Sequence, residues 1–511
     1  MICKGHISET RPGQSMRPNV LSGLRSCLLG LFSFPAMLIT GLLVSPFLAS
    51  LDRRQGDAVL QDPDIWWHLR NAEVLLSTHR FIREDIYSFT THGQPWIDHE
   101  WLAEIPYYIG FRLLGERGVF LVMLAAVELV IAGILLLCYR RTGDPKAAVL
   151  ATLIAVFFAS ISFGPRTLLF GWLCFIAEML LLEAFRKGRD HIWWLAPLFA
   201  FWINLHGSWM IGLAFFLLFV ASGLMQGSWG SIEAVRWTPL QLRKLFVVGA
   251  ASLAMLFANP YGWRLVTYPF DMIFRQRQMV FLTEEWHSIN FQGFYGTLLF
   301  IVLALMLVLT LVRRRRWPLH DLLFALLATY AALTHVRFLF LTGIVVCPIL
   351  SEELAGALFA PYDRERDKPL LNAALMAVFC VFAVRHIPTS ATLRAAAVQC
   401  FPSAALSELN RCCKQGHLFN LFEWGGYLIW NAHDTPVFLD SRADIFEYHG
   451  ILADYVKATT MNDSLAIFDR YRIDSVLEPP TSAIVYLLKH TPGWRVQYED
   501  ATAALLVRTM P

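Results

Sequence analysis

Residues 62–70, Asp-Pro-Asp-Ile-Trp-Trp-His-Leu-Arg, place two carboxylates, an imidazole and a guanidinium in one short stretch directly after an apolar run. A carboxylate such as Asp64 can act as a general base and accept a proton from a reacting hydroxyl. Asp62 is an alternative base, although its position just before a helical pattern is also typical of a capping residue. His68 and Arg70 are candidates for substrate binding, because a guanidinium matches the geometry of phosphate oxygens.

A second polar cluster occupies residues 96–104, Trp-Ile-Asp-His-Glu-Trp-Leu-Ala-Glu. Asp98, His99 and Glu100 are candidates for a second acid–base group or for metal ligands, and acids at the start of a helix are the ordinary alternative. His99 is also a candidate for substrate binding. Apolar residues recur on one face of residues 64–79, which predicts a helix lying in a membrane interface. The second cluster predicts another such helix, beginning at Asp98 and ending near Gly110.

Long apolar runs must position these clusters. The 511-residue chain is 56% hydrophobic and 16% charged, whereas soluble proteins have about 25% charged residues. Runs of roughly 17–22 residues are long enough to cross a ~30 Å hydrocarbon core as helices. We therefore predict a polytopic α-helical membrane protein with about 11 transmembrane helices. They are expected at residues 27–48, 118–138, 147–164, 167–184, 192–205, 209–226, 245–259, 294–312, 319–334, 338–352 and 370–385.

Basic clusters occupy alternate connections between these runs, at residues 139–146, 185–191, 227–244, 313–318 and 353–369. Because Lys and Arg favour the cytoplasmic side, these connections and the N-terminal tail, 1–25, are predicted to be cytoplasmic. An odd number of spans within residues 26–385 then places the first outer loop, 51–117, and residues 386–511 on the extracytoplasmic side. No glycine-rich nucleotide loop is present, and no nucleic-acid partner is expected.

The connections on the predicted outer side are polar and aromatic rather than basic. They contribute further substrate-binding candidates, namely Arg166, Asn204, His206, His335 and Arg337, and one candidate metal ligand, Glu285. Ionisable groups near the hydrocarbon boundary usually line a cavity or pair with one another. Each cluster alone could be a turn or a helix cap, but their common side predicts a single outward-facing cavity.

The composition changes after residue 385, where short apolar strands alternate with amphipathic helices. We predict a small extracytoplasmic α/β domain over residues 386–511, with strands at 418–421, 437–440, 475–477, 495–498 and 503–507. Its segment 423–427, Glu-Trp-Gly-Gly-Tyr, allows close backbone approach at the glycines. Trp424 and Tyr427 are candidates to contact a substrate, and an ordinary buried turn is the alternative. The sequence is compatible with a Cys400–Cys412 disulfide and equally with two free thiols at these positions.

At these residues the chain resembles the GT-C membrane glycosyltransferases, which use sugars linked to a polyprenyl phosphate. That class combines many membrane helices with an acidic first outer loop, two interfacial helices and often a soluble C-terminal domain. Asp62-x-Asp64 with Arg70 is similar to the first-loop pattern of the oligosaccharyltransferase catalytic subunit. Residues 423–427, with Asp440 and Arg442 downstream, partly match its soluble-domain signature, and Thr283-Glu284-Glu285 resembles the Thr/Ser-x-x-Glu element of its fifth outer loop. The Trp-Trp-Asp element of that subunit is not reproduced, and the chain is more similar to bacterial members of the superfamily.

The resemblance implies transfer of a sugar, with inversion, from a polyprenyl-phosphate donor to an acceptor on the outer side of the inner (cytoplasmic) membrane. Asp64 would be the base, with Asp62 or Glu100 as alternatives. The phosphate would be held by Arg70, Arg166, Arg337 and His335. A divalent cation (Mg²⁺ or Mn²⁺) held by Asp62, Asp64 and Glu285 could share that role. The sugar and the acceptor stay open.

Two other functions would explain part of the pattern. A transporter, or a protein that handles lipid or glycan without chemistry, would also carry His and Arg at membrane depth. Transporters typically have two similar halves with broken helices, and this sequence shows no internal repeat. A structural scaffold would not require acids in the first outer loop. A cavity holding Asp64, Arg70 and Arg337 together would favour the enzyme.

Overall fold

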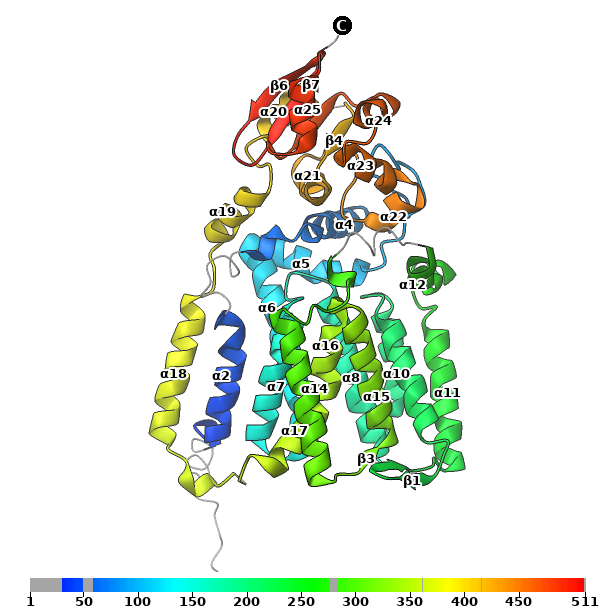
Figure 1. Cartoon of the computed structure of the whole chain (residues 1–511), viewed down its shortest axis with the longest axis vertical. Coiled ribbons are helices and arrows are strands. Elements are labelled where there is room, and N and C mark those ends of the chain that lie inside the picture. Colours follow the sequence, from blue (N-terminus) through cyan, green and yellow to red (C-terminus); the bar gives the residue numbers. More distant parts are fainter. Residues whose placement is uncertain (1–29, 49–57, 276–283, 361, 415, 510–511) are drawn as a thin grey trace, which may run out of the picture.

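The computed structural model describes residues 30–48, 58–275, 284–360, 362–414 and 416–509. The predicted N-terminal tail and Thr283 lie outside the described residues. Three levels are visible along the long axis of the molecule: a layer of upright helices, a set of helices lying across one end of it, and a C-terminal domain beyond them (Figure 1).

Each predicted apolar run overlaps one helix of this layer. These helices are α2 (Phe34–Leu48), α6 (Glu116–Thr142), α7 (Pro145–Ser160), α8 (Leu168–Arg186), α9 (Leu195–Trp202), α10 (Trp209–Ser222), α11 (Pro239–Met255), α14 (Phe294–Arg313), α15 (Leu319–Thr334), α17 (Cys347–Ala357) and α18 (Pro369–Arg385).

Length and composition give a lower count of membrane crossings than the prediction. Within the described ranges, four helices are long and apolar enough to cross a membrane, or five if the bent pair of α18 and α19 (Ser390–Cys400) is one span. Five further apolar helices are only 10–17 residues long. Helix α14 exposes large apolar side chains such as Phe300 and Val312, as lipid contact requires. The chain has several membrane-length helices, and the exact number of crossings stays a prediction.

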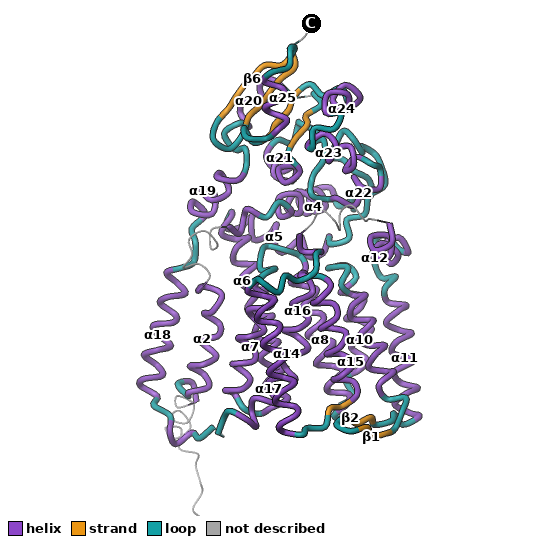
Figure 2. The backbone as a smooth tube through the Cα atoms, in the orientation of Figure 1, coloured by secondary structure: helices purple, strands orange, loops and turns teal. Residues whose placement is uncertain are grey.

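The predicted basic connections lie at the end of the helical layer opposite the C-terminal domain (Figure 1). We call these two ends the basic face and the domain face. A small sheet closes the basic face and is visible as short strands in Figure 2. It consists of β1 (Gly227–Trp229), β2 (Ile232–Ala234) and β3 (Trp317–Pro318).

Three helices lie across the domain face: α4 (Asp64–Thr78), α5 (Trp101–Leu114) and α12 (Trp263–Arg275). The predicted first helix, 64–79, is confirmed to within one residue. The predicted bounds of the second are wrong, because α5 begins at Trp101 and continues through Gly110. A Cβ on Gly110 would lie 2.8 Å from the carbonyl oxygen of Gly118. Gly110 therefore allows α5 and α6 to cross closely and does not end the helix.

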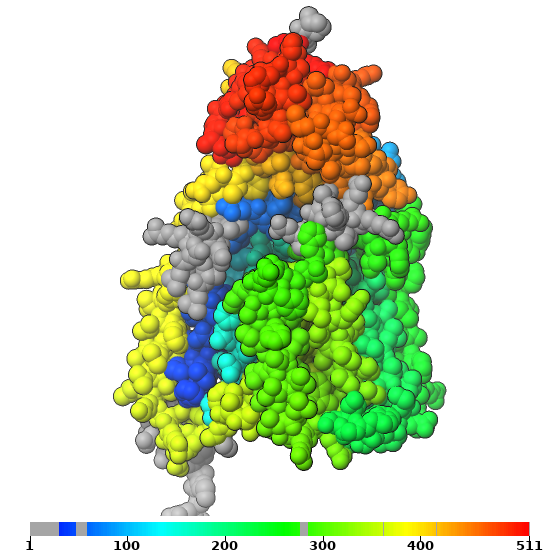
Figure 3. Space-filling view, viewed as in Figure 1, coloured from blue at the N-terminus to red at the C-terminus, as the bar shows by residue number. Residues whose placement is uncertain are grey.

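Residues 390–509 form the domain that covers the domain face (Figure 3). Its sheet has the strand order β4-β5-β7-β6, in which β4 and β5 are parallel and the other pairs antiparallel. The strands are β4 (Leu418–Asn420), β5 (Ser475–Glu478), β6 (Trp494–Glu499) and β7 (Ala504–Arg508). The helices are α20 (Leu406–Cys412), α21 (Gly425–Asn431), α22 (Ala443–Tyr448), α23 (Ile451–Thr459), α24 (Ser464–Arg470) and α25 (Ala483–Lys489).

One predicted strand of this domain is wrong. Residues 437–440 form no regular strand, because Val437 makes isolated bridges to Ser88 of the first loop and to Leu418. The segment therefore joins the loop to the sheet. The two cysteines considered for a disulfide, Cys400 and Cys412, are free thiols.

Candidate active site

A cavity of about 640 Å³ lies between the helical layer and the C-terminal domain. It is lined from four sources: the first loop, the connections at 161–166, 285–286 and 336–337, helix α12, and the C-terminal domain through Phe422 and the segment 441–444. The predicted candidates that line it are Asp64, His99, Glu100, Arg166, Glu285 and Arg337. Segments far apart in the sequence thus bring carboxylates and guanidinium groups into one pocket.

Arg166 is the centre of an ionic network on the side of this cavity that faces the helical layer. Its Nε donates to Asp62 at 2.7 Å, and its Nη1 donates to Glu285 at 2.9 Å. Arg337 lies 3.9 Å from Glu285, and its guanidinium stacks over the ring of Trp286 at 4.2 Å. Two guanidinium groups therefore face the cavity with one partly exposed carboxylate between them.

Asp64 is the first residue of α4, where the backbone N–H of Asp64 donates to Asp62 at 3.0 Å. Its own carboxylate has no arginine or lysine within ion-pair distance among the described residues. It accepts a long hydrogen bond of 3.4 Å from Trp67 Nε1, which also donates to Ser441 at 3.0 Å. Burial, and then the neighbouring Asp62, raise the pKa of Asp64 to about 7. A carboxylate with this pKa suits a general base at neutral pH.

Glu100 sits among three histidines. His206, His99 and His68 each place Nε2 3.4–3.6 Å from its carboxylate. Burial would raise the pKa of Glu100, but His99 and then the other two lower it to about 2. Burial lowers the pKa values of His68 and His206 to about 4. Glu100 is therefore ionised at neutral pH, but its low pKa gives it a low proton affinity, which is unfavourable for a general base.

Glu104 anchors the other side of this group. His68 Nδ1 lies 2.7 Å from Glu104, which also accepts from Asn71 at 3.2 Å. Burial raises the pKa of Glu104 and that of its neighbour Asp98, the latter to about 7. His68 thus joins α4 to α5 and does not line the cavity.

The predicted metal ligands do not fit a metal ion as they are placed. Arg166 lies between Asp62 and Glu285 and bonds both, so its guanidinium takes the position that a cation would need. Across the described residues, no group of three or more His, Cys, Asp or Glu side chains is arranged to hold a metal ion.

Several predicted substrate-binding residues lie outside the cavity and make other contacts. Arg70 pairs with Glu73 one turn along α4. Asn204 accepts from Trp101 Nε1 at 3.0 Å and donates to the carbonyls of Ala200 and Ala258. His335 lies 2.6 Å from the carbonyl of Trp286 and ties the 284–290 loop to the end of α15. These contacts position the loops that form the cavity.

The glycine-rich segment of the C-terminal domain packs against the start of α4, as its glycines predict. A Cβ on Gly426 would lie 2.4 Å from the carbonyl oxygen of Pro63. Tyr427 stacks on Phe401 at 4.7 Å, and Trp424 donates to the carbonyl of Cys400 at 2.8 Å. Tyr427 also packs edge-on against Trp66 of α4 at 5.1 Å, so it lies at the interface between the two parts. Neither Trp424 nor Tyr427 lines the cavity.

Sequence reasoning names Trp67, Trp96 and Arg442 without placing them in the cavity, and it misses Tyr268 and Asp444. It therefore does not reveal the side of the cavity that faces α12 and the C-terminal domain. That side is lined by Trp67, Trp96, Tyr268, Ser441, Arg442 and Asp444. The available signals were the strongly amphipathic segment 263–275 and the Asp-Ser-Arg run at 440–442. Neither signal reveals a shared site, because the contacts join residues more than 150 positions apart, such as Tyr268 Oη and Asp444 at 2.9 Å.

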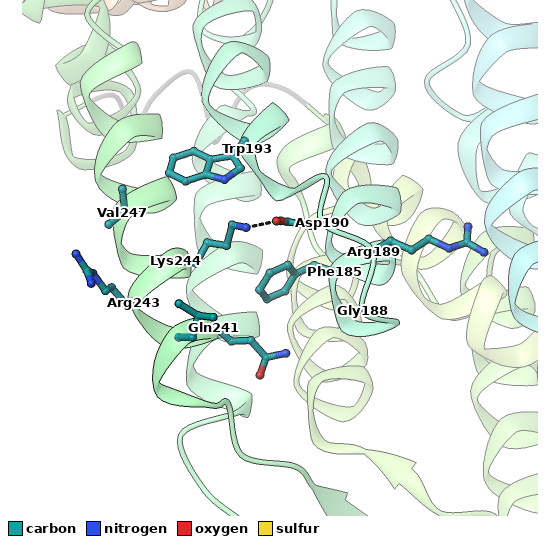
Figure 4. Close-up of a pocket in the computed structure, with 10 residues that line it drawn as sticks. Phe185, Gly188, Arg189, Asp190, Trp193, Gln241, Arg243, Lys244 and Val247 are labelled. Atoms are coloured by element: carbon teal, nitrogen blue, oxygen red, sulfur yellow. Dashed lines mark hydrogen bonds and ion pairs between the residues drawn. The ribbon is translucent and has the colours of Figure 1, made fainter.

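A second cavity, of about 470 Å³, lies at the basic face between the end of α8 and the start of α11. Figure 4 shows Lys244 paired with Asp190 below Trp193, while Arg189 and Arg243 extend away from the pair. Its one acidic side chain is neutralised, and none of the predicted site residues lines it.

The architecture described above is a GT-C-like fold. No protein-family model matches the chain, and no curated protein sequence matches it. The fold is shared with the crystal structure of the oligosaccharyltransferase of Archaeoglobus fulgidus in the apo form. That likeness has a TM-score of 0.53 and 12% sequence identity, and covers 86% of this chain and 69% of the other.

Two solved structures of ArnT from Cupriavidus metallidurans are also similar. The structure bound to undecaprenyl phosphate has a TM-score of 0.49 and 14% identity, and covers 91% of this chain and 97% of the other. The apo structure has the same score and identity and covers 96% and 98%.

Proposed function

We propose that this chain is a GT-C glycosyltransferase that moves a sugar from a polyprenyl-phosphate-linked donor to an acceptor hydroxyl at the domain face. The observation that carries this proposal is the position of Asp64, whose pKa is raised to about 7, in one cavity with Arg166 and Arg337. A base and two phosphate-binding cations, placed where membrane helices end, match what a lipid-borne donor requires. The GT-C-like fold supports the same reaction class.

In the proposed reaction, the acceptor oxygen forms a bond to the anomeric carbon as the bond from that carbon to the phosphate oxygen breaks. Asp64 takes the proton of the acceptor hydroxyl. The phosphate leaves with the electron pair of the broken bond, and Arg166 and Arg337 stabilise its charge. Attack from the face opposite the phosphate inverts the anomeric configuration. Trp67 and Ser441 hold Asp64 in place through their shared hydrogen bonds.

The arrangement of the chain in the membrane follows from the same proposal. The basic face would be cytoplasmic, because Lys and Arg gather there, and the C-terminal domain extracytoplasmic. The membrane would be the inner (cytoplasmic) membrane, with the polyprenyl tail in the bilayer. No step is assigned to a divalent cation, because Arg166 bonds two of its three proposed ligands.

The decisive experiment reconstitutes the purified full chain in lipid with radiolabelled polyprenyl-phosphate sugars and follows release of polyprenyl phosphate. We expect release that depends on an acceptor and is lost in Asp64→Asn. Donor binding without release in the wild-type chain would contradict the proposal and favour a lipid-handling protein. Equal release by wild type and Asp64→Asn would remove Asp64 as the base.

A further inference from the structure

Buried nitrogen atoms without partners are concentrated at the domain-face cavity. Within the part of the chain that the structure describes, five buried side-chain nitrogens have no hydrogen-bond partner. Three of them, His99 Nδ1, Trp286 Nε1 and Arg442 Nη1, belong to side chains that line this cavity. Since roughly 90% or more of buried polar groups in proteins are paired, these three atoms require an explanation. A polar ligand in the cavity supplies one.

Arg442 is held rigidly enough to present its free nitrogen in one direction. Its Nε donates to Asp440 at 2.8 Å, and its Nη2 donates to Asp440 and Asp85 at 2.6 and 2.7 Å. The rings of Tyr87 and Trp96 lie 4.9 and 4.7 Å from its Cζ. Only Nη1 remains, on a side chain that is 1% exposed. Preorganisation of this kind is typical of a binding site.

Arg442 belongs to what we call the aromatic end of the cavity, which consists of Trp96, His99, Tyr268, Arg442 and Asp444. Asp444 is oriented by Tyr268 Oη at 2.9 Å and by Trp96 Nε1 at 3.2 Å. The rings of His99 and Tyr268 lie 4.5 Å apart and tilt by 32°. This end therefore combines flat apolar faces, a guanidinium and a carboxylate.

The guanidinium, the carboxylate and the aromatic rings of the aromatic end together favour some kinds of ligand over others. A phosphate bound here would meet the carboxylate of Asp444, which is unfavourable because like charges repel. A hydroxyl can donate to a carboxylate and accept from a guanidinium at the same time. A sugar ring carries several hydroxyls on its rim and an apolar face that can lie on an aromatic ring. The phosphate then belongs at the other end, beside Arg166 and Arg337.

We propose that the aromatic end binds a sugar ring, with Arg442 Nη1 donating to a hydroxyl oxygen and Asp444 accepting from a hydroxyl. The proposal deepens the transfer reaction described above and rests on it for the source of the ring. That ring can belong to the lipid-linked donor or to an acceptor glycan, which share this chemistry. His99 Nδ1 donates or accepts at the same ring, according to its tautomer.

The test compares two kinds of probe on the full chain in lipid nanodiscs. One is undecaprenyl phosphate, which has no sugar, and the others are undecaprenyl phosphates carrying glucose, galactose, mannose or N-acetylglucosamine. In Asp444→Asn we expect the tightest sugar-linked probe to bind at least about tenfold more weakly, because the sugar hydroxyl loses the carboxylate that accepts its hydrogen bond. Binding of undecaprenyl phosphate should not change. Tyr268→Phe, which removes only the hydroxyl that orients Asp444, should show a smaller loss in the same direction.

The other outcomes are also decisive. If the donor probes bind unchanged in Asp444→Asn but binding of the soluble disaccharide lactose is lost, the ring is that of the acceptor. If Asp444→Asn changes the binding of neither the donor probes nor lactose, the proposed sugar subsite is wrong. It is also wrong if the variant weakens the binding of undecaprenyl phosphate and of its sugar-linked forms equally. If the wild-type chain binds undecaprenyl phosphate but prefers none of its sugar-linked forms and does not bind lactose, the subsite is also wrong.

Failure to bind undecaprenyl phosphate at all would instead contradict the proposed function. Asp190→Asn, at the basic-face cavity, is the matched control and should change no binding constant.

Discussion

Two ion clusters at opposite ends of the helical layer differ in how completely their charges are paired. The basic-face cluster has three arginines and three acids: Arg141, Arg313, Arg315, Asp321, Glu352 and Glu353. Arg141 holds Asp321 through two bonds of 2.6 and 3.1 Å and reaches Glu352 at 3.3 Å. Arg315 pairs with both glutamates, and Arg313 pairs with Glu353 and donates to the backbone carbonyls of Glu352 and Glu353. Every charge in this cluster has an opposite partner.

The domain-face cavity lacks this balance. Asp64 has no cationic partner within ion-pair distance among the described residues, Arg337 is 3.9 Å from its nearest carboxylate, and Arg442 keeps one free nitrogen. Complete pairing indicates a cluster that fastens helices α6, α14, α15 and α17 together. Incomplete pairing leaves charges whose partners a substrate can provide. Both clusters contain buried ionisable groups, so burial alone does not distinguish them.

The largest effect should follow from removal of the unpaired carboxylate. Asp64→Asn is expected to lower the transfer rate by ~10²–10⁴, the range for loss of a general base. The thermal unfolding midpoint should stay the same or rise, because the variant removes a carboxylate whose ionisation burial opposes. Rates from radiolabelled donor and unfolding curves in detergent measure both. If Asp64→Asn lost activity because it unfolds, Asp64 would have a structural role instead of a catalytic one.

The matched change at the basic face should reverse that result. Asp321 is 3% exposed, and Asp321→Asn leaves Arg141 without its closest partner. Breaking a buried pair costs about 3–5 kcal/mol, so the unfolding midpoint should fall clearly. The transfer rate per folded molecule should not change. If this variant were stable but inactive, complete pairing would not identify a structural cluster.

The sequence predicts the layout of the cavity better than its individual ligands. Each predicted apolar run overlaps a helix, and the basic connections lie at one end of the helical layer, because hydrocarbon thickness and charge act locally along the chain. The number of crossings and their orientation stay predictions. The periodicity of 64–79 similarly places Asp64 at the start of α4. Arg70 is predicted to bind phosphate because its guanidinium matches phosphate oxygens, yet its helical spacing directs it to Glu73.

The aromatic end lay beyond prediction for a different reason. Tyr268, Asp444 and Trp96 come from three regions of the chain, and only the packing of the C-terminal domain on α12 and the first loop brings them together. Val437 shows the same limit. Its apolar neighbours predict a strand, but its backbone bonds reach the first loop and β4 as single bridges. Contacts of this kind have no local signal in one sequence.

The pH dependence of transfer sharpens the difference between the clusters. Because the base must be ionised and the pKa of Asp64 is about 7, the rate should rise through pH 7 and fall about tenfold per unit below pH 6. The groups facing Asp64 have opposite effects, since Asp62 raises its pKa and Arg166 lowers it. Asp62→Asn should therefore move the inflection to lower pH, whereas Asp321→Asn should leave it in place. A profile that is flat from pH 5 to 8 in the wild type would contradict the assignment.

The smallest expected effect is that of removing divalent cations. Arg166 already bonds Asp62 and Glu285, so the charge that a cation would bring to the phosphate is supplied by a guanidinium. We expect EDTA to change the transfer rate by less than about twofold. Removal of a catalytic metal would have a much larger effect, because such a metal stabilises the transition state by several kcal/mol. Loss of activity in EDTA and its return with Mn²⁺ would show that Arg166 moves aside when substrate binds. In that case Arg166→Ala should tighten cation binding, because it releases two oxygen ligands, and titration of the variant with Mn²⁺ would measure the gain.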